Sequence, residues 1–158
     1  MTEWLTAEQQ AYWRAYLTAT ALLQDRLSRE LQEAHGISLS DYEILVRLSE
    51  SPERRMRMST LADRTCSSRS RLSHQVDRLE GLSLVVRQAC ETDRRGSNAV
   101  LTDTGMDLLV TAAPTHVAGV RQHMVDCLPE EQFRALGEAC EAMVEGLRTT
   151  AAMDAPSA

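Results

Sequence analysis

The chain contains no lysine, and several other features are scarce. All 17 basic residues among its 158 positions are arginine. Aromatic residues make up only 4%, so the core must consist mainly of Leu, Val, Ala and Met. No apolar run approaches the roughly 20 residues that span a bilayer. The polar start of the chain lacks the basic and apolar regions of a secretory signal. We therefore expect a cytoplasmic protein with no membrane partner.

Cysteines are few and widely spaced. Cys66, Cys90, Cys127 and Cys140 form no CxxC or CxxH arrangement. In a chain without a secretory signal, this spacing favours free and mostly buried thiols, although an even number also allows two disulfides.

Motifs of enzymes are missing as well. There is no nucleophile elbow, no glycine-rich phosphate loop and no HExxH motif. The sequence therefore predicts a protein that is not an enzyme, with no catalytic residue and no cofactor.

Charge is unevenly distributed along the chain, whose net charge is −6. Residues 54–95 contain ten arginines and five acids, a net charge of +5, whereas the remainder has seven arginines and eighteen acids, a net charge of −11. Because charges more than about 8–10 Å apart are screened at physiological salt, the local balance decides what this segment attracts. A basic segment between acidic arms is typical of a module that contacts phosphates with its middle. Genomic base composition would explain arginine in place of lysine, but not the clustering.

Long helices are predicted at both ends of the chain. Residues 7–34 repeat apolar side chains at steps of three and four, and Gly36 follows as a stop signal. Residues 103–128 form a second helix with a bend at Pro114, and a last helix begins at Pro129. These helices carry apolar stripes without room for a core of their own. We therefore expect a two-fold dimer in which they interlock.

The middle of the chain predicts a winged helix-turn-helix. Ser59 is expected to cap a short helix over 59–65, and Ser68 caps a longer one over 69–80 after a tight turn. The pattern then changes period. Residues 84–90 and 97–102 indicate two strands, and the basic segment 91–96 indicates the turn between them.

One more helix precedes this motif. Ser40 is expected to cap it, with Glu43 completing a capping box. The helix should end near Pro52 and continue into a loop.

The predicted fold class is therefore mainly α with a small β-hairpin wing, a winged helix-turn-helix with N- and C-terminal dimerisation helices. Residues 1–36 and 103–150 form the helical dimerisation region, and residues 37–102 form the DNA-binding domain. Residues 151–158 are expected to be a flexible tail.

Three stretches of the sequence resemble the MarR family of bacterial regulators. They are LADR at 61–64, SRSRLSHQVDRLE at 68–80, and DRRG followed by LTDTG within 93–105. The pairing of VDRLE with the later DRRG and LT..G is specific, whereas either part alone is weak. The resemblance covers nearly the whole chain. It implies a triangular, mainly helical homodimer with recognition helices in successive major grooves and wings at the minor groove.

Two positions depart from the family pattern. The family usually has glycine at the position of Ser83, whereas this chain has Gly81. We therefore expect a rebuilt turn that changes the angle of the wing. Many relatives have arginine at the position of His74, so base preference there should differ.

The second helix of the motif has a polar face opposite its apolar stripe. Arg71 and His74 are expected to meet base edges, because the arginine fork suits guanine. Other polar side chains of this helix are expected to contact phosphates, and a merely solvated face is the alternative. The predicted DNA-binding set is Ser59, Thr60, Ser68, Arg69, Ser70, Arg71, Ser73, His74, Arg78, Arg94 and Arg95.

The resemblance also assigns roles in the wing and in an effector site. It implies that Arg94 or Arg95 enters the minor groove, while Asp93 braces the wing through an ion pair. Two exposed turn arginines are the alternative. It further implies that Trp13 and Tyr16 line a cleft for a small aromatic effector, with ordinary core packing as the alternative.

A metal site is the weakest of the hypotheses. His116, His123 and Cys127 share one helix face, but no fourth ligand lies in register. Packing at an interface is expected instead, and no metal is predicted.

We therefore predict a sequence-specific DNA-binding transcriptional regulator, a repressor, that acts as a homodimer on an inverted-repeat operator and is released by a small aromatic effector. Its expected partners are double-stranded DNA, a second copy of the chain and that ligand. The alternatives are a winged-helix protein–protein interaction module without specific DNA binding, and a metal-responsive regulator.

Overall fold

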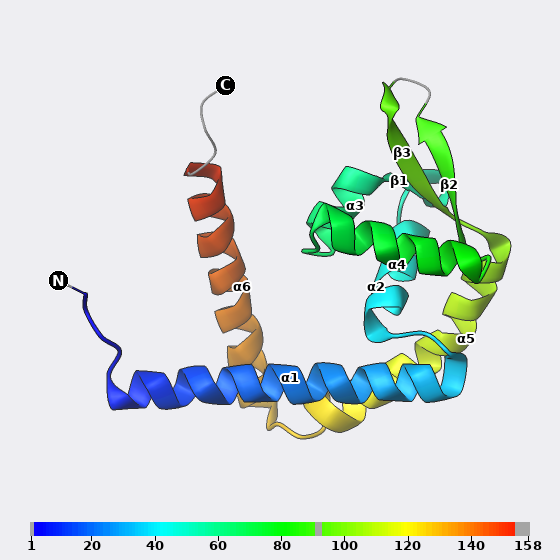
Figure 1. The fold of residues 1–158 in the computed structure, drawn as a ribbon. Coiled ribbons are helices and arrows are strands. Elements are labelled where there is room, and N and C mark those ends of the chain that lie inside the picture. Colours follow the sequence, from blue (N-terminus) through cyan, green and yellow to red (C-terminus); the bar gives the residue numbers. More distant parts are fainter. Residues whose placement is uncertain (1, 91–92, 154–158) are drawn as a thin grey trace. The chain divides into compact units, whose positions relative to one another are not determined.

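The computed structural model describes residues 2–90 and 93–153, with side chains described outside 93–95 and 151–153. It divides into two compact units, Met1–Gly119 and Val120–Ala158. The elements of the first unit are shown in Figure 1. The described helices are α1 (Ala7–His35), α2 (Leu39–Ser49), α3 (Met58–Arg64), α4 (Arg69–Gly81), α5 (Asp103–Val120) and α6 (Glu130–Met153). The described strands are β1 (Arg55–Arg57), β2 (Val85–Cys90) and β3 (Asp93–Leu101).

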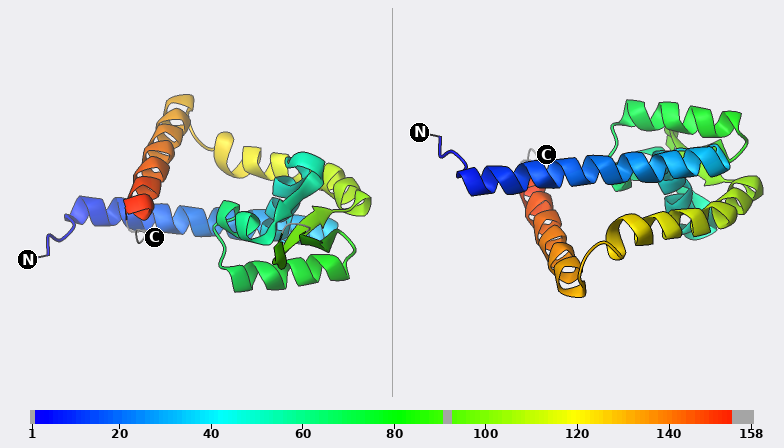
Figure 2. Two further views of the ribbon diagram at one scale, coloured as in Figure 1. Left: turned by 90° about the horizontal axis from the view of Figure 1, so that it is seen from above. Right: turned by 90° about the horizontal axis from the view of Figure 1, so that it is seen from below.

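The first helix has the extent that its periodicity predicted. Thr6 caps α1 in a capping box with Gln9, and Gly36 ends it at a φ of 72°, the left-handed region that favours glycine. Leu27 and Leu31 are buried near its C-terminal end. Both views in Figure 2 show the N-terminal half of α1 extending beyond the lobe of α2 to α5.

The predicted cap of α2 was wrong by two residues. Ser38, not Ser40, is the N-cap, and Asp41, not Glu43, completes the capping box. The Ser38 hydroxyl accepts a hydrogen bond from the Asp41 backbone N–H, and the Asp41 carboxylate accepts one from the Ser38 N–H at 2.8 Å. Either serine could serve as a cap. The helix begins after Ser38 because the Asp41 carboxylate accepts the hydrogen bond from the Ser38 N–H.

The start of α3 also differs from the prediction. Ser59 is not its cap, because the helix begins at Met58, and the N-cap, Arg57, makes no side-chain capping bond. A short strand, β1, leads directly into the helix, so the extended backbone at Arg57 already provides the N-cap conformation. Three residues with one buried side chain, Met56, are too few to show a strand period in the sequence.

The strands form an antiparallel sheet in the order β1-β3-β2. The predicted turn over 91–96 was too long, because β3 begins at Asp93. The β2–β3 register shifts between Ala89, opposite Ser97, and Cys90, opposite Asp93. Polar residues continue this ladder because a ribbon that projects into solvent needs no apolar alternation. Residues 91 and 92 lie outside the described residues.

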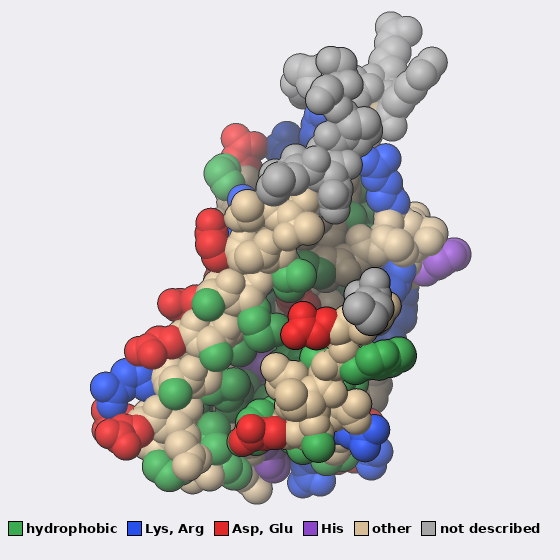
Figure 3. Space-filling view, turned by 90° about the vertical axis from the view of Figure 1, so that its left-hand side faces the viewer, with side chains coloured by type: hydrophobic (Ala, Val, Ile, Leu, Met, Phe, Trp, Pro, Cys, Tyr) green, Lys and Arg blue, Asp and Glu red, His purple; other side chains and the backbone are tan. Residues whose placement is uncertain are grey.

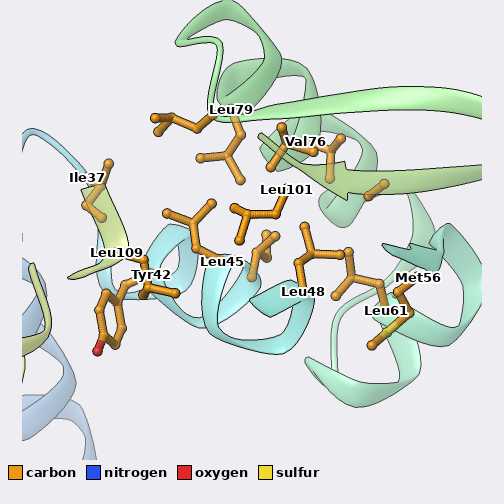
Figure 4. Packing of buried hydrophobic residues seen from close by; sticks show 14 of the residues in the cluster. Ile37, Tyr42, Leu45, Leu48, Met56, Leu61, Val76, Leu79, Leu101 and Leu109 are labelled. Carbon is orange, nitrogen blue, oxygen red and sulfur yellow. The ribbon is translucent and has the colours of Figure 1, made fainter. Parts of the chain in front are cut away.

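The core lies within the first unit and contains few aromatics, as the composition predicted. In Figure 4, Leu45 and Leu101 meet at its centre, with Leu79 and Val76 on one side. All four side chains are at most 4% exposed. Each buried side chain of this kind stabilises the fold by about 1.5–3 kcal/mol. This packing anchors α4 and the base of the hairpin to α2 and α5.

The start of α5 packs closely against the base of the wing. Thr102 donates its hydroxyl proton to the carbonyl oxygen of Ser83 at 2.8 Å or of Leu84 at 3.0 Å. A Cβ at Gly105 would stand 2.1 Å from the backbone oxygen of Leu84. The spacing of LT..G therefore reflects close packing between the helix and the first strand.

Helix α5 begins at Asp103 and continues as an α-helix through Pro114 to Val120. A π-helical turn follows over Arg121–Val125. The second unit continues with α6, whose first turn contains Glu130 and Glu131 beside the positive end of the helix dipole. Of the tail predicted over 151–158, residues 154–158 lie outside the described residues. Among the helices of the described part of the chain, none is long and apolar enough to cross a membrane.

Candidate nucleic-acid interface

Helix α4 has the two faces that its sequence predicted. Leu72, Val76 and Leu79 are at most 1% exposed and hold the helix on the core. On the opposite face, Arg71 and His74 are exposed. Two side chains able to donate to base edges therefore stand on a helix whose orientation is set by packing.

The N-terminal end of α4 is capped as expected. The Ser68 hydroxyl accepts a hydrogen bond from the Arg71 backbone N–H at 3.3 Å. Ser68, Arg69 and Ser70 are all exposed, and Ser59 near the start of α3 is exposed with them, as is Thr60. Backbone N–H groups without helical partners collect at such an end, which favours an anion there.

Arg78 has a partner that the sequence analysis missed. Its Nη2 donates to Oδ2 of Asp41 at 2.6 Å, and Asp41 is only 1% exposed. The pair joins the recognition helix to the capping box of α2. Removing one member of such a pair leaves a buried charge without compensation. One sequence feature could have indicated this role: Asp41 is the third helical residue after Ser38, where an acid completes a capping box.

A groove of about 480 Å³ lies between the start of α2 and the exposed face of α4. Several predicted DNA contacts share it with two serines of α2 that the prediction assigned no binding role. Its lining consists of Ser38, Ser40, Asp41, Ser70, Arg71, His74, Gln75 and Arg78. Two guanidinium groups and serine hydroxyls suit a phosphate group, whereas the N–H groups of Leu39 and Asp41 at the start of α2 already donate to Ser28 and Ser38.

Ser73 faces the hairpin and is half-buried. Its hydroxyl and backbone oxygen accept hydrogen bonds from Arg87 of β2 at 3.1 and 2.9 Å. Arg87 also forms ion pairs with Asp77 and Glu80. Burial alone lowers the pKa of Arg87, but hydrogen bonds and charge attraction from the two carboxylates outweigh it, so the pKa is raised above the usual value. Arg87 thus stays charged and links the hairpin to α4.

The tip of the wing is described only by its backbone. Asp93, Arg94 and Arg95 belong to β3, and their side chains lie outside the described part of the structure. The minor-groove and bracing roles expected of them remain predictions.

The residues predicted for an effector site lie on exposed helix surface. Trp13 and Tyr16 stack with ring centroids 6.0 Å apart, at 50% and 41% exposure. A separate pocket of about 290 Å³ between α2 and α5 contains Arg47, Tyr42 and His116. There Nε of Arg47 and Nδ1 of His116 are buried and have no hydrogen-bond partner. Burial lowers the pKa of His116. Its ring packs on that of Tyr42, with the two ring centroids 4.6 Å apart.

The cysteines form no disulfides, but the expectation of burial was wrong. Cys66, Cys127 and Cys140 are exposed thiols. They lie in a turn or along the C-terminal part of the chain, outside the core cluster. Cys90 is half-buried, and its sulfur accepts a hydrogen bond from Arg57 at 3.3 Å. In the described part of the chain, no group of three or more His, Cys, Asp or Glu side chains is placed to hold a metal ion.

Known proteins share this arrangement over most of the chain. The MarR family model matches residues 37–97. A DNA-complexed structure of Sco3205, a MarR family transcriptional regulator from Streptomyces coelicolor, is 48% identical with a TM-score of 0.88, covering 93% of this chain and 92% of that chain. AbsC, another MarR family regulator from Streptomyces coelicolor, is also 48% identical with a TM-score of 0.85, covering 94% of this chain and 99% of its own.

A more distant relative is the HTH-type transcriptional regulator MhqR of Bacillus subtilis. It is 26% identical over 123 residues, which cover 78% of this chain and 79% of MhqR. The two structures at 48% identity extend the likeness beyond the matched winged helix to nearly the full chain. These proteins are regulators and not enzymes, and the chain belongs to the MarR family of winged helix-turn-helix transcriptional regulators.

Proposed function

We propose that this protein is a cytoplasmic homodimer that binds an inverted-repeat operator and represses transcription by blocking polymerase. Helix α4 of each copy enters the major groove, and each wing reaches the adjacent minor groove. The observation that carries this proposal is the exposed polar face of α4, with Arg71 and His74, on a helix held by a fully buried stripe. Sco3205, at 48% identity, was crystallised in complex with DNA.

Contacts of α4 divide into base reading and positioning. Arg71 offers the two-donor fork that suits guanine, and His74 offers one donor or acceptor at the next turn of the helix. Ser68, Arg69 and Ser70 serve phosphates from the capped N-terminus. Phosphate contacts fix the register of the helix, and base contacts specify the sequence.

The groove between α2 and α4 supports a further phosphate contact. Arg78 is 47% exposed in its side chain while it is held by Asp41. Its remaining donors are therefore aligned before DNA arrives, and little side-chain entropy is lost on binding. Ser40 lines the same groove from the start of α2.

Homodimer formation is supported by apolar surface that each unit leaves open. On α1, Leu22 is 64% exposed and Leu17 is 46% exposed. On α6, Leu147 and Met143 are 68% and 47% exposed. Figure 3 shows apolar side chains in green, open to solvent among acidic ones in red. Apolar stripes on long helices are typical of surfaces buried against a second copy.

The test is selection of bound duplexes from a random DNA pool at about 150 mM salt, followed by sequencing. We expect an inverted repeat with half-sites about one helical turn apart. His74→Ala should relax preference at one base position of each half-site, while Arg121→Ala, an exposed change in the second unit, should leave the motif unchanged. Salt-sensitive retention without any enriched sequence would contradict the proposal and favour the protein interaction module.

We further propose that a small aromatic effector releases DNA by favouring a dimer whose recognition helices are wrongly spaced. The stacked rings of Trp13 and Tyr16 offer aromatic surface, and the pocket between α2 and α5 offers two buried nitrogens without partners. Aromatic acids and phenols should be titrated against the operator complex while tryptophan fluorescence is followed. Quenching and release that are both lost in Trp13→Leu would support an effector site at the Trp13 and Tyr16 rings. Release that persists unchanged in that variant would exclude Trp13 from it.

A further inference from the structure

Arg87 of β2 forms several hydrogen bonds and ion pairs with the recognition helix α4. Its backbone N–H donates to Glu80 Oε1 at 2.6 Å. Its guanidinium donates through Nη1 to Asp77 and Glu80, and through Nη2 to the backbone oxygen and hydroxyl of Ser73. Ser73, Asp77 and Glu80 are successive positions along one side of α4, so a single side chain contacts two turns of the helix.

The geometry of these contacts restricts rotation of the hairpin. A guanidinium is planar and donates in fixed directions, so bonds from both of its ends orient the plane as well as its distance from the helix. The Arg87 side chain is only 25% exposed and Glu80 is 31% exposed. This partial burial protects the ion pair with Glu80 from screening, whereas Asp77 is 56% exposed and its pair is screened more.

Apolar packing holds the base of the hairpin, where Val85 and Ala99 are buried, but it contributes little to the outer part of the wing. Val86 is 40% exposed, and Gln88 and Ala89 are exposed as well. The hairpin is a two-stranded ribbon beyond the end of β1, and its register shifts after Ala89. A ribbon of this kind has no core of its own to set its direction. The direction must therefore be set at its base, where Arg87 lies beside the buried Val85 and opposite the buried Ala99.

We propose that Arg87 is a positioning residue for DNA binding, which fixes the angle between the recognition helix and the wing without touching DNA. This inference rests on the proposed DNA-binding function. Ser73 then serves this contact rather than DNA. Helix α4 and the wing therefore bind DNA as one rigid body, because Asp77 and Glu80 of α4 both bind Arg87 of β2.

The first experiment separates positioning from direct phosphate contact. Operator affinity is measured for Arg87→Met, Arg87→Lys and the double variant Asp77→Ala/Glu80→Ala. Lysine keeps the charge but not the fork, so both Arg87 variants should lose about tenfold in affinity. The acid-free variant should also bind more weakly, although it removes two negative charges. Full affinity in Arg87→Lys, or tighter binding by the acid-free variant, would show that charge alone acts here and would overturn the proposal.

A double-mutant cycle with the wing supplies the second test. If Arg87 acts through the wing, Arg87→Met and Arg95→Ala should lower affinity by about tenfold each but by clearly less than a hundredfold together. Thermal unfolding of each variant controls for the fold. A fully multiplicative loss would mean that Arg87 acts independently of the wing.

A third measurement uses the full-length protein without DNA. Amide hydrogen exchange in β2 and β3 should accelerate in Arg87→Met, while exchange at the buried α4 residues stays slow. This readout keeps the inference distinct from the proposed function. Unchanged exchange in the hairpin would overturn the positioning role, whereas the absence of an operator in the selection experiment would defeat DNA binding alone.

Discussion

The lobe of α2 to α5 and the sheet differs from α6 in how it uses its apolar side chains. In the lobe, Leu45 and Leu48 are fully buried, and even a carboxylate, Asp41, is covered and paired. On α6, Phe133 and Val144 are 36% and 44% exposed. The lobe completes its core within one chain, whereas α6 offers a stripe that needs another surface. Stability of the lobe should therefore be a property of the single chain, while that of α6 should depend on protein concentration.

The largest expected effect comes from paired glycine substitutions, one in each region. Gly105→Ala should destabilise the protein by about 3 kcal/mol, because its Cβ would meet the Leu84 backbone oxygen at 2.1 Å and Leu101 at 2.7 Å. Gly137→Ala on α6 meets nothing within 4 Å and should stabilise the helix by up to about 1 kcal/mol. Urea unfolding measures both. Equal effects would remove the distinction between the regions.

Leu147→Asp should weaken self-association by about a hundredfold or more, because Leu147 is 68% exposed on the apolar stripe of α6 and an interface would bury it. Analytical ultracentrifugation measures the dissociation constant. Glu138→Ala, on the polar side of the same helix, is the control. A Leu147→Asp protein that associates as tightly as the wild type would exclude this stripe from the dimer.

Arg78→Ala should cost about 2 kcal/mol, since it leaves the buried Asp41 carboxylate without its ion-pair partner. Solvent screening of the half-exposed arginine keeps the cost below that of a fully buried pair. Arg121→Ala breaks an exposed pair with Asp126 in the second unit and should cost less than about 0.5 kcal/mol. Denaturant midpoints of the two variants give the comparison, and similar losses would contradict it.

Ser83→Gly should stabilise the lobe by about 1 kcal/mol. Ser83 has a φ of 59°, a conformation that costs an L-residue about 1–2 kcal/mol and glycine almost nothing. Thermal unfolding measures the gain. Destabilisation would show that its side chain contributes more than the backbone strain costs.

The smallest effect concerns pH. Burial lowers the pKa of His116, so the unfolded chain binds a proton more readily than the folded one. This contribution is fully present above the ordinary histidine pKa of about 6.5 and is lost as pH falls through the lowered folded value. In His116→Phe, the drop in unfolding free energy between pH 7.5 and 5.5 should be smaller than in the wild type. An equal drop would assign the pH dependence to other groups.

Local sequence signals predicted well where the helices α1 and α4 begin or end. Gly36 ends α1 and Ser68 caps α4, because a left-handed residue and a hydroxyl acceptor act within one helical turn. That the turn at Ser83 differs from the family's turn stays a prediction. Serine adopts the left-handed conformation itself, since the Ser83 and Leu84 N–H groups bond to Glu80 and Leu79 there. Local backbone bonding at the end of α4 outweighed a conformational preference of about 1 kcal/mol.

The sequence alone determined the apolar stripe of α4, its exposed polar face and the hairpin that follows, because periodicity and caps depend on near neighbours in the chain. Only the tertiary structure decided the partners of Arg78 on α4 and of Arg87 on β2. Arg78 pairs with an acid 37 residues away and Arg87 with acids ten and seven residues away. A charged side chain pairs with whichever opposite charge the packing of the core brings near, and no spacing rule in the sequence encodes that choice.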